Sequence, residues 1–559
     1  MKNTAIIITV LAGMLSACGS DTGFVGDEPC LDCFEPDGAP VTETRTLSLE
    51  QLGGPGEAEV FVNDEVCESP CIVNVEYDAE VRVEVKPALQ ASFRNWQEPC
   101  GEELVCEFVV TENTSLGFYL DVAGEPLSQT SPEGLAGVAS TVVDSEGNFY
   151  MVGMMRWQRP GDPRRLLASK LIPYVVKLSP EGALLWSEEF DSQEDNMRSG
   201  GFQNGLLALS PDEQSLYVAG IGGGVSSEFD EMRLYQLNTQ QGTRGWQRDM
   251  VWRRSNGYAQ PANLAVGTTG SIYLAGISTT SFSASGQTVN SRGNLDSFLL
   301  TYTEGGALGG LIQWNTLHES DVTFNLDLVP DASGGVYVLN QHQIIPEEGA
   351  RDSSQMIAHI GSDGVLQSEV PVHTSVSRIA PTAEGGFVIA GSYSRASTAA
   401  ELELPTPVGS DDMFLGEVDP DGSMRWIRAL GGDRDEYARS LVVDRHSNIH
   451  LLAEARSSGF SDFGGGALPS LGYYDGVAAS YSATGEFRWA HTFGSSGAFA
   501  EPQSMSRGPN DQLFFFGEMR ETLTGPMGEL TAPFHHDTRQ DPNIPSDDSY
   551  APYILSFRQ

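Results

Sequence analysis

The chain has 559 residues, of which 40% are hydrophobic and 19% charged, so it can bury large cores and is not a disordered acidic tail. Its 76 Asp and Glu against 32 Lys and Arg give a formal net charge of -44. Because Lys and Arg contacts to phosphate drive nucleic-acid affinity, this balance excludes a nucleic acid as the expected partner.

An export signal is predicted over residues 1–17. Lys2 supplies a positive start, and an apolar stretch from Ala5 to Leu15 is shorter than the ~20 residues of a membrane-spanning helix. It ends in Leu-Ser-Ala before Cys18, which resembles the lipobox of bacterial lipoproteins. The resemblance implies a lipid anchor on Cys18, and Gly19 after it implies the outer membrane of the cell envelope. An ordinary secretory peptide is the alternative.

Residues 18–44 are rich in Gly, Asp, Glu and Pro, which predicts an acidic tether. The other six cysteines all lie before residue 107, and an even set in an exported segment predicts disulfides. These disulfide candidates are Cys30, Cys33, Cys67, Cys71, Cys100 and Cys106. Fifteen pairings are possible, and we expect local pairs. A zinc site made by the first four is the alternative.

A small β module is predicted over residues 45–122, because short runs such as Glu80 to Val85 alternate between polar and apolar residues. The cysteine spacing, together with Phe93 and Trp96, resembles the divergent internalin B-repeat family of extracellular β modules. In that family the module is usually a spacer. We therefore expect Phe93 and Trp96 to pack in the core, with a sugar-stacking platform as the alternative.

Seven repeats are predicted over residues 123–559. A short apolar strand recurs roughly every 60 residues, with its fourth residue at Tyr150, Tyr217, Tyr273, Tyr337, Val388, His450 and Phe514. A second motif, two strands around a Gly turn, follows most copies and often ends in Trp, as at Trp186 and Trp426. Such units leave apolar faces and strand edges uncovered until they pack on their neighbours.

The repeats resemble the seven-bladed bacterial propeller repeat of exported proteins, most clearly in the stretch Gly431-Gly432-Asp433-x-Asp435. The resemblance implies an all-β fold, with a seven-bladed β-propeller after the disulfide-bonded module. The last unit is one strand short, and residues 123–130 are placed to complete it. This join would offset the entropy of closing a long chain; an open solenoid is the alternative.

Four-stranded blades alternate their connections between two faces. The short turns carry acidic pairs such as those of Asp144 and Asp419, which we interpret as turns and not as calcium ligands. The long connections, 154–172, 277–295, 392–410, 454–474 and 518–549, are expected on the other face, where aromatic residues favour recognition. The ligand-binding candidates are Trp157, Arg164, Arg165, Phe460, Phe463, Tyr473, Tyr474 and Phe534. Insertions without a ligand are the alternative.

No catalytic signature is present. His318-Glu319 lacks the second histidine of HExxH, and no G-x-S-x-G elbow occurs. His535-His536-Asp537 is interpreted as an acidic loop, so we expect neither a metal nor a cofactor. An active site assembled from several blades would leave no local motif.

The sequence therefore predicts a non-enzymatic lipoprotein that displays a propeller for binding a protein or a glycan at the cell surface. Two alternatives remain, a periplasmic scaffold for outer-membrane assembly and a polysaccharide hydrolase or lyase.

Overall fold

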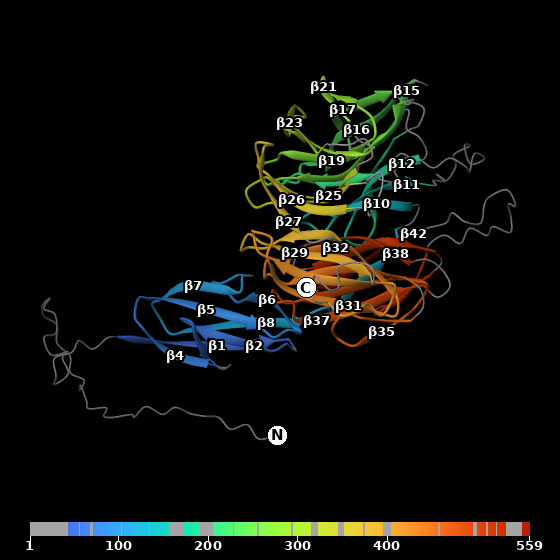
Figure 1. Cartoon of the computed structure of the whole chain (residues 1–559). Coiled ribbons are helices and arrows are strands. Elements are labelled where there is room, and N and C mark those ends of the chain that lie inside the picture. Colours follow the sequence, from blue (N-terminus) through green and yellow to red (C-terminus); the bar gives the residue numbers. More distant parts are fainter. Residues whose placement is uncertain are drawn as a thin grey trace, which may run out of the picture.

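In the computed structural model, the named elements of the described residues are all β-strands, which confirms the expected all-β class (Figure 1). The structure describes residues 43–559 except for 55, 68–70, 102, 133–134, 156–171, 191–204, 227–228, 254–255, 292–293, 315–321, 345–351, 373–374, 395–403, 457–458, 496–499, 510–511, 521 and 533–550. No helix within these residues is long and apolar enough to cross a membrane.

The first part of the described chain is a two-sheet module. Its strands are β1 (Thr44–Gly53), β2 (Ala58–Val62), β3 (Glu65–Cys67), β4 (Cys71–Glu76), β5 (Ala79–Pro87), β6 (Ala91–Trp96), β7 (Val105–Val110) and β8 (Thr114–Val122). One sheet has the order β4-β1-β8-β6 and the other β3-β2-β5-β7. Within the first sheet β1 and β8 run parallel.

The module core follows from the alternation in its sequence. Val81, Val83 and Val85 on β5 are fully buried, whereas the residues between them face outward. The Trp96 indole is buried as well, and its Nε1 donates a hydrogen bond to the Glu103 carbonyl at 2.9 Å. The Phe93 ring packs on it edge to face. Both aromatic residues therefore lie in the core, as expected.

Two local disulfides tie the module together, Cys67–Cys71 and Cys100–Cys106. Both have the short sequence separation that we expected. Since Cys67 and Cys71 are bonded to each other, their sulfurs are not available for the alternative zinc site. The predictions for Cys18, Cys30 and Cys33 lie outside the described residues.

Beyond the module, the described strands form seven antiparallel sheets, four with four strands and three with six. Each contains a four-stranded unit, and in the three larger sheets a hairpin from the next repeat adds two strands. Sheet 1 contains β10 (Ala136–Val143), β11 (Phe149–Met155), β12 (Ile172–Leu178) and β13 (Leu184–Glu189); sheet 2, β14 (Leu206–Leu209), β15 (Ser215–Ser226), β16 (Phe229–Asn238) and β17 (Arg244–Arg253). Sheet 3 contains β18 (Ala259–Val266), β19 (Ile272–Ser278), β22 (Asp296–Tyr302) and β23 (Leu308–Trp314); sheet 4, β24 (Val322–Pro330), β25 (Val336–Ile344), β26 (Asp352–Ile360) and β27 (Leu366–Val372).

Sheets 5 to 7 continue this plan. Sheet 5 contains β28 (Val376–Pro381), β29 (Phe387–Ser394), β30 (Asp411–Val418) and β31 (Met424–Gly432); sheet 6, β32 (Asp435–Val443), β33 (Ile449–Arg456), β36 (Tyr474–Tyr481) and β37 (Phe487–Gly494). Sheet 7 contains β38 (Ala500–Arg507), β39 (Gln512–Met519), β42 (Ala551–Arg558) and β9 (Pro126–Thr130). The recurring apolar motif of the sequence is the second strand of each sheet.

The first strands of the seven sheets contact one another in cyclic order. β10 contacts β14, and the series continues through β18, β24, β28 and β32 to β38, which contacts β10. In sheet 7 the fourth strand comes from the other end of the repeats, because β9 pairs with β42 in antiparallel register. The expectation that residues 123–130 complete the last unit is thereby confirmed.

Acidic residues in the short turns accept hydrogen bonds from backbone N–H groups of the same turn, as expected if they stabilise turns. An Asp144 side-chain oxygen accepts hydrogen bonds from the backbone N–H groups of Glu146 and Asn148 at 3.1 and 2.8 Å. Gly147 completes this turn with a φ of 83°. The turn after β32 repeats the arrangement, with Asp444 accepting from His446 and Asn448.

Tryptophans on the fourth strands join successive sheets. Trp186 of sheet 1 lies against Gly242 in the turn of sheet 2, and Trp426 of sheet 5 lies against Gly485 in the turn of sheet 6. A Cβ atom at either glycine would come within 2.7 Å of the indole. Trp489 of sheet 6 lies in the same way against Gly124, just before β9. The contact therefore continues across the point where the two ends of the repeat region meet.

Candidate functional site

The antiparallel sheets separate two faces. Connections between first and second strands, and between third and fourth strands, lie on what we call the short-turn face. Connections between second and third strands, and the passages from one sheet to the next, lie on what we call the loop face. This assignment matches the two classes of connection that we distinguished in the sequence.

The module is attached to the short-turn face, beside sheets 6 and 7 (Figure 1). The buried Arg488 guanidinium, at the start of β37, donates hydrogen bonds to the carbonyls of Leu89 and Ala91, both at 3.0 Å. Arg558, at the end of β42, forms an ion pair with the module's Asp121 at 2.9 Å. Burial lowers the pKa of Arg488 to about 10, so it remains charged at neutral pH.

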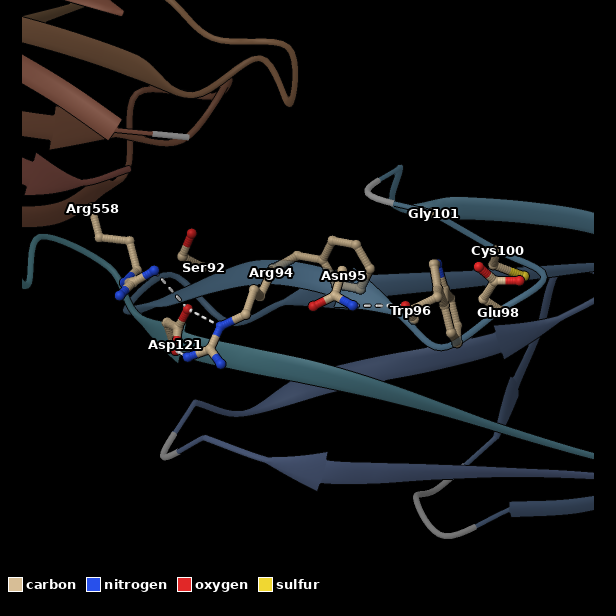
Figure 2. Close-up of a pocket in the computed structure, with 10 residues that line it drawn as sticks. Ser92, Arg94, Asn95, Trp96, Glu98, Cys100, Gly101, Asp121 and Arg558 are labelled. Carbon is tan, nitrogen blue, oxygen red and sulfur yellow. Dashed lines mark hydrogen bonds and ion pairs between the residues drawn. The ribbon is translucent and has the colours of Figure 1, made fainter. Parts of the chain in front are cut away.

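A polar pocket of about 430 Å³ lies at this junction. It is lined by Ser92, Phe93, Arg94, Asn95, Trp96, Glu98, Cys100, Gly101, Asp121 and Arg558. Figure 2 shows Arg94 and Arg558 approaching Asp121 from two sides. Because Asp121 already pairs with both guanidinium groups, we interpret the pocket as part of the joint between module and sheets.

Three long connections form hairpins that extend the preceding sheet. They are β20–β21 (Phe282–Ala284 and Gln287–Val289), β34–β35 (Phe460–Asp462 and Ala467–Pro469) and β40–β41 (Thr522–Gly525 and Gly528–Thr531). The hairpins pair with the fourth strands β17, β31 and β37, respectively. Each also contributes a buried apolar residue, Phe282, Phe463 or Leu523. These connections therefore cover strand edges as well as forming the loop face.

The structure separates the predicted ligand-binding residues into three groups. Phe463 corrects the expectation, because its side chain is fully buried beneath the hairpin and cannot contact a ligand at the surface. Phe460 and Tyr473 are exposed, and Tyr474 is half-buried. Trp157, Arg164, Arg165 and Phe534 lie outside the described residues, as does the histidine pair at 535–536.

Tyr473 and Tyr474 belong to a group that we call the tyrosine–arginine cluster, made of Tyr437, Arg456, Tyr473 and Tyr474. The Arg456 guanidinium lies over the Tyr437 ring at 4.9 Å and over the Tyr474 ring at 5.4 Å. Tyr473 packs edge to face on Tyr474, with 5.0 Å between ring centroids. Register explains the proximity, because Arg456 and Tyr474 are direct partners in neighbouring strands.

Acidic residues fix this cluster from below and from the side. Glu454, which has no exposed side-chain surface, binds the guanidinium groups of both Arg456 and Arg439. Arg439 also reaches Glu501 of sheet 7 at 3.4 Å. The Tyr437 hydroxyl donates to Asp411 of sheet 5 at 3.2 Å. The positive charges on this part of the loop face are therefore held against carboxylates, and three sheets contribute to it.

A second pair of carboxyl groups lies nearby in sheet 7. Glu501 and Glu518 are direct partners on β38 and β39, and the Glu518 carboxylate accepts a hydrogen bond from the Val138 backbone N–H. Burial, assisted by the charge of Glu501, raises the pKa of Glu518 to about 7. Glu518 is therefore a group that can exchange a proton near neutral pH.

Sequence reasoning missed Tyr437 and Arg456. Tyr437 follows the Gly431-Gly432-Asp433 stretch that carried the propeller resemblance, but it lies outside the long connections. Arg456 lies within the connection 454–474, where only the aromatic residues were singled out. Only strand register brings them beside Tyr474. Within the described residues, no group of three or more His, Cys, Asp or Glu side chains is arranged to hold a metal ion.

No protein-family model and no curated protein matches this sequence. The similar solved structures include β-propellers. The propeller domain of the Trilobed protease from Pyrococcus furiosus has 8% identity and a TM-score of 0.39, over 73% of this chain and 98% of that one. The Dos1 propeller has 7% identity and a TM-score of 0.36, over 92% and 94%. The polysaccharide lyase Uly1 has 9% identity and a TM-score of 0.38, over 87% and 100%.

Proposed function

We propose that this chain is a non-enzymatic lipoprotein of the outer membrane that binds a ligand outside the cell. In this proposal Cys18 carries the lipid, residues 18–44 are the tether, and the internalin B-repeat-like module of residues 45–122 is a spacer. The seven sheets are the blades of one closed propeller, related to the seven-bladed bacterial propeller repeat. The loop face carries the ligand site.

The observation that carries the proposal is the placement of the module. Its contacts with the sheets come from Arg488, Arg558 and neighbouring residues of the short-turn face. The chain that leads to the expected anchor therefore leaves from one face, and the loop face points away from the module. Closure of the propeller is supported by the cyclic contacts of the first strands and by the pairing of β9 with β42.

Protease shaving of intact cells tests the location. We expect an antibody against the propeller to lose its signal on shaving, while a periplasmic control protein stays intact. Full protection until the outer membrane is broken would contradict surface display and would favour the periplasmic scaffold.

A Cys18→Ser variant tests the anchor. We expect the wild-type protein to incorporate labelled fatty acid and to sediment with membranes, and the variant to do neither. Incorporation of the label by Cys18→Ser would place the lipid elsewhere, and no incorporation by the wild type would contradict the lipoprotein assignment.

The Glu501–Glu518 pair favours a second candidate, a polysaccharide hydrolase. Glycoside hydrolysis commonly uses one protonated and one ionised carboxyl group, and Glu518, with a pKa of about 7, can hold a proton near neutral pH. A screen that measures new reducing ends distinguishes this candidate from a binding protein. Activity that disappears in both Glu518→Gln and Glu501→Gln would establish the hydrolase and contradict the non-enzymatic assignment.

A further inference from the structure

The tyrosine–arginine cluster presents one exposed aromatic ring, that of Tyr473, to solvent. The Tyr473 side chain is 61% exposed, although it is anchored edge to face on the Tyr474 ring. The Arg456 guanidinium lies between the Tyr474 and Tyr437 rings and is bound to the buried Glu454, although the Arg456 side chain is still 41% exposed. The surface is therefore ordered before any ligand arrives, which lowers the entropy lost on binding.

The surroundings of the rings are rich in hydrogen-bonding groups. Arg456, whose side chain is 41% exposed, contacts the Tyr474 ring, and Asp411 accepts a hydrogen bond from the Tyr437 hydroxyl. Carboxylates accept hydrogen bonds from hydroxyl groups, while guanidinium groups donate them. An aromatic face bordered by such groups matches a pyranose ring, which has an apolar C–H face and a rim of hydroxyls.

Charge defines the class of sugar. The two guanidinium groups of Arg456 and Arg439 are balanced by the two carboxylates of Glu454 and Glu501, so neither offers an uncompensated positive charge. The whole chain carries a formal charge of -44. A polyanionic chain would be repelled by this field, whereas an uncharged one would not.

A protein ligand fits less well. Protein interfaces are depleted of Asp and Glu, whereas this cluster contains two such residues, Glu454 bound to Arg456 and Asp411 bound to the Tyr437 hydroxyl. A hydroxyl-rich ligand can hydrogen-bond to the exposed part of Arg456 without burying an unpaired charge.

We propose that the tyrosine–arginine cluster binds a neutral polysaccharide, with one sugar ring stacked on Tyr473. The proposal rests on the loop face being the ligand-binding face of this chain. It adds the site, Tyr473 with Arg456 and Tyr474, and the chemical class of the ligand.

Affinity electrophoresis of the full chain tests the proposal. The probes are three soluble neutral polysaccharides, a β-1,3-glucan, a galactomannan and starch, with polygalacturonate as the charged comparison. We expect at least one neutral polymer to retard the protein and polygalacturonate not to do so. Tyr473→Ala should weaken that retardation by about tenfold, and Arg456→Gln should weaken it as well.

The module supplies a matched control. Its Tyr77 is also exposed, at 48%, and the Arg45 guanidinium lies 4.9 Å from the centre of its ring. Tyr77→Ala removes the same chemistry from a different surface and should leave the retardation unchanged. Since Tyr473 is exposed, Tyr473→Ala should keep the thermal unfolding midpoint of the wild type, which shows that the fold is intact.

Each other outcome overturns the proposal in a distinct way. Retardation that persists in Tyr473→Ala would exclude this site, although loss in another loop-face variant would keep the proposed function. Retardation by polygalacturonate alone would exclude the neutral class. If no neutral polymer retards the wild-type chain, the inference is wrong, while the shaving experiment still decides the surface display.

Discussion

Glu436 is a carboxyl group with no exposed surface on the first strand of sheet 6. One of its oxygens accepts a hydrogen bond from the Ser461 hydroxyl of hairpin β34–β35 at 2.6 Å. Burial, with a smaller contribution from the negative charge of Asp412, raises its pKa to about 8. At neutral pH the folded protein therefore holds a proton that the unfolded chain has released.

This shift makes stability depend on pH. The free energy of unfolding should fall as pH rises from the ordinary glutamate value, about 4.5, to about 8, because only the unfolded state releases the proton in that window. Glu436→Gln removes this contribution. We expect the variant to gain stability relative to wild type between pH 5 and pH 9, by a few kcal/mol at most.

Urea unfolding at pH 5, 7 and 9 measures the effect. Glu486→Gln, at an exposed glutamate in a short turn of the same sheet, is the matched control and should follow the wild-type profile. An equal stability difference between Glu436→Gln and wild type at all three pH values would contradict the prediction.

At the scale of the elements, the contact between a tryptophan and the turn glycine of the next sheet joins the sheets. Gly485 has a φ of 72°, and a Cβ there would lie 2.7 Å from the Trp426 ring. Gly286, in the turn of hairpin β20–β21, also has a positive φ, 83°, but a Cβ there would meet nothing within 4 Å. Substitution of Gly286 therefore measures the cost of the left-handed backbone alone, whereas substitution of Gly485 measures that cost together with the disturbed tryptophan contact.

We therefore expect Gly485→Ala to be more destabilising than Gly286→Ala. The second variant should cost about 1 kcal/mol for the left-handed backbone alone. Gly485→Ala must also displace the Trp426 indole, so we expect it to lower the free energy of unfolding by about 2–4 kcal/mol in total. Chemical denaturation of both variants gives the comparison, and equal losses would show that the contact does not stabilise the fold.

At the scale of the whole molecule, residues at the two ends of the repeats meet in sheet 7. Ser128 of β9 is the partner of Ser556 on β42, and their hydroxyls are 2.6 Å apart. The Arg558 N–H donates to the Glu125 carbonyl, and the Gly124 N–H donates to the Arg558 carbonyl. Sheet 7 is therefore complete only when β9, from the start of the repeat region, pairs with β42 from its end.

Proline substitutions in β9 test the importance of this join. Successive N–H groups of a strand point to opposite edges, so only one of Ser128→Pro and Gln129→Pro removes a hydrogen bond to β42. We expect one variant to lose about 3 kcal/mol and to associate through the uncovered β42 edge, and the other to resemble wild type. Thermal unfolding and size-exclusion chromatography detect both effects, and two near-wild-type variants would show that β9 is dispensable.

The sequence by itself predicted the all-β class, local disulfides in the module, and residues 123–130 as the strand that completes the last unit. The first two are local properties, because alternation in β5 or a pair of close cysteines lies within a few residues. The third is a contact between distant segments, which the sequence indicated because the last repeat is one strand short. The sequence also predicted that Trp96 is buried in the core of the module. Only the tertiary structure decided that Phe463 is buried, because the hairpin that carries it pairs with a strand of the preceding sheet.

The tertiary structure alone also brought Tyr437 and Arg456 beside Tyr474, since strand register and not sequence distance makes them neighbours. It likewise decided that the module attaches opposite the loop face, through Arg488 hydrogen bonds to residues about 400 positions away. Local spacing determines which strands form. Contacts between distant segments determine which side chains remain exposed for a ligand.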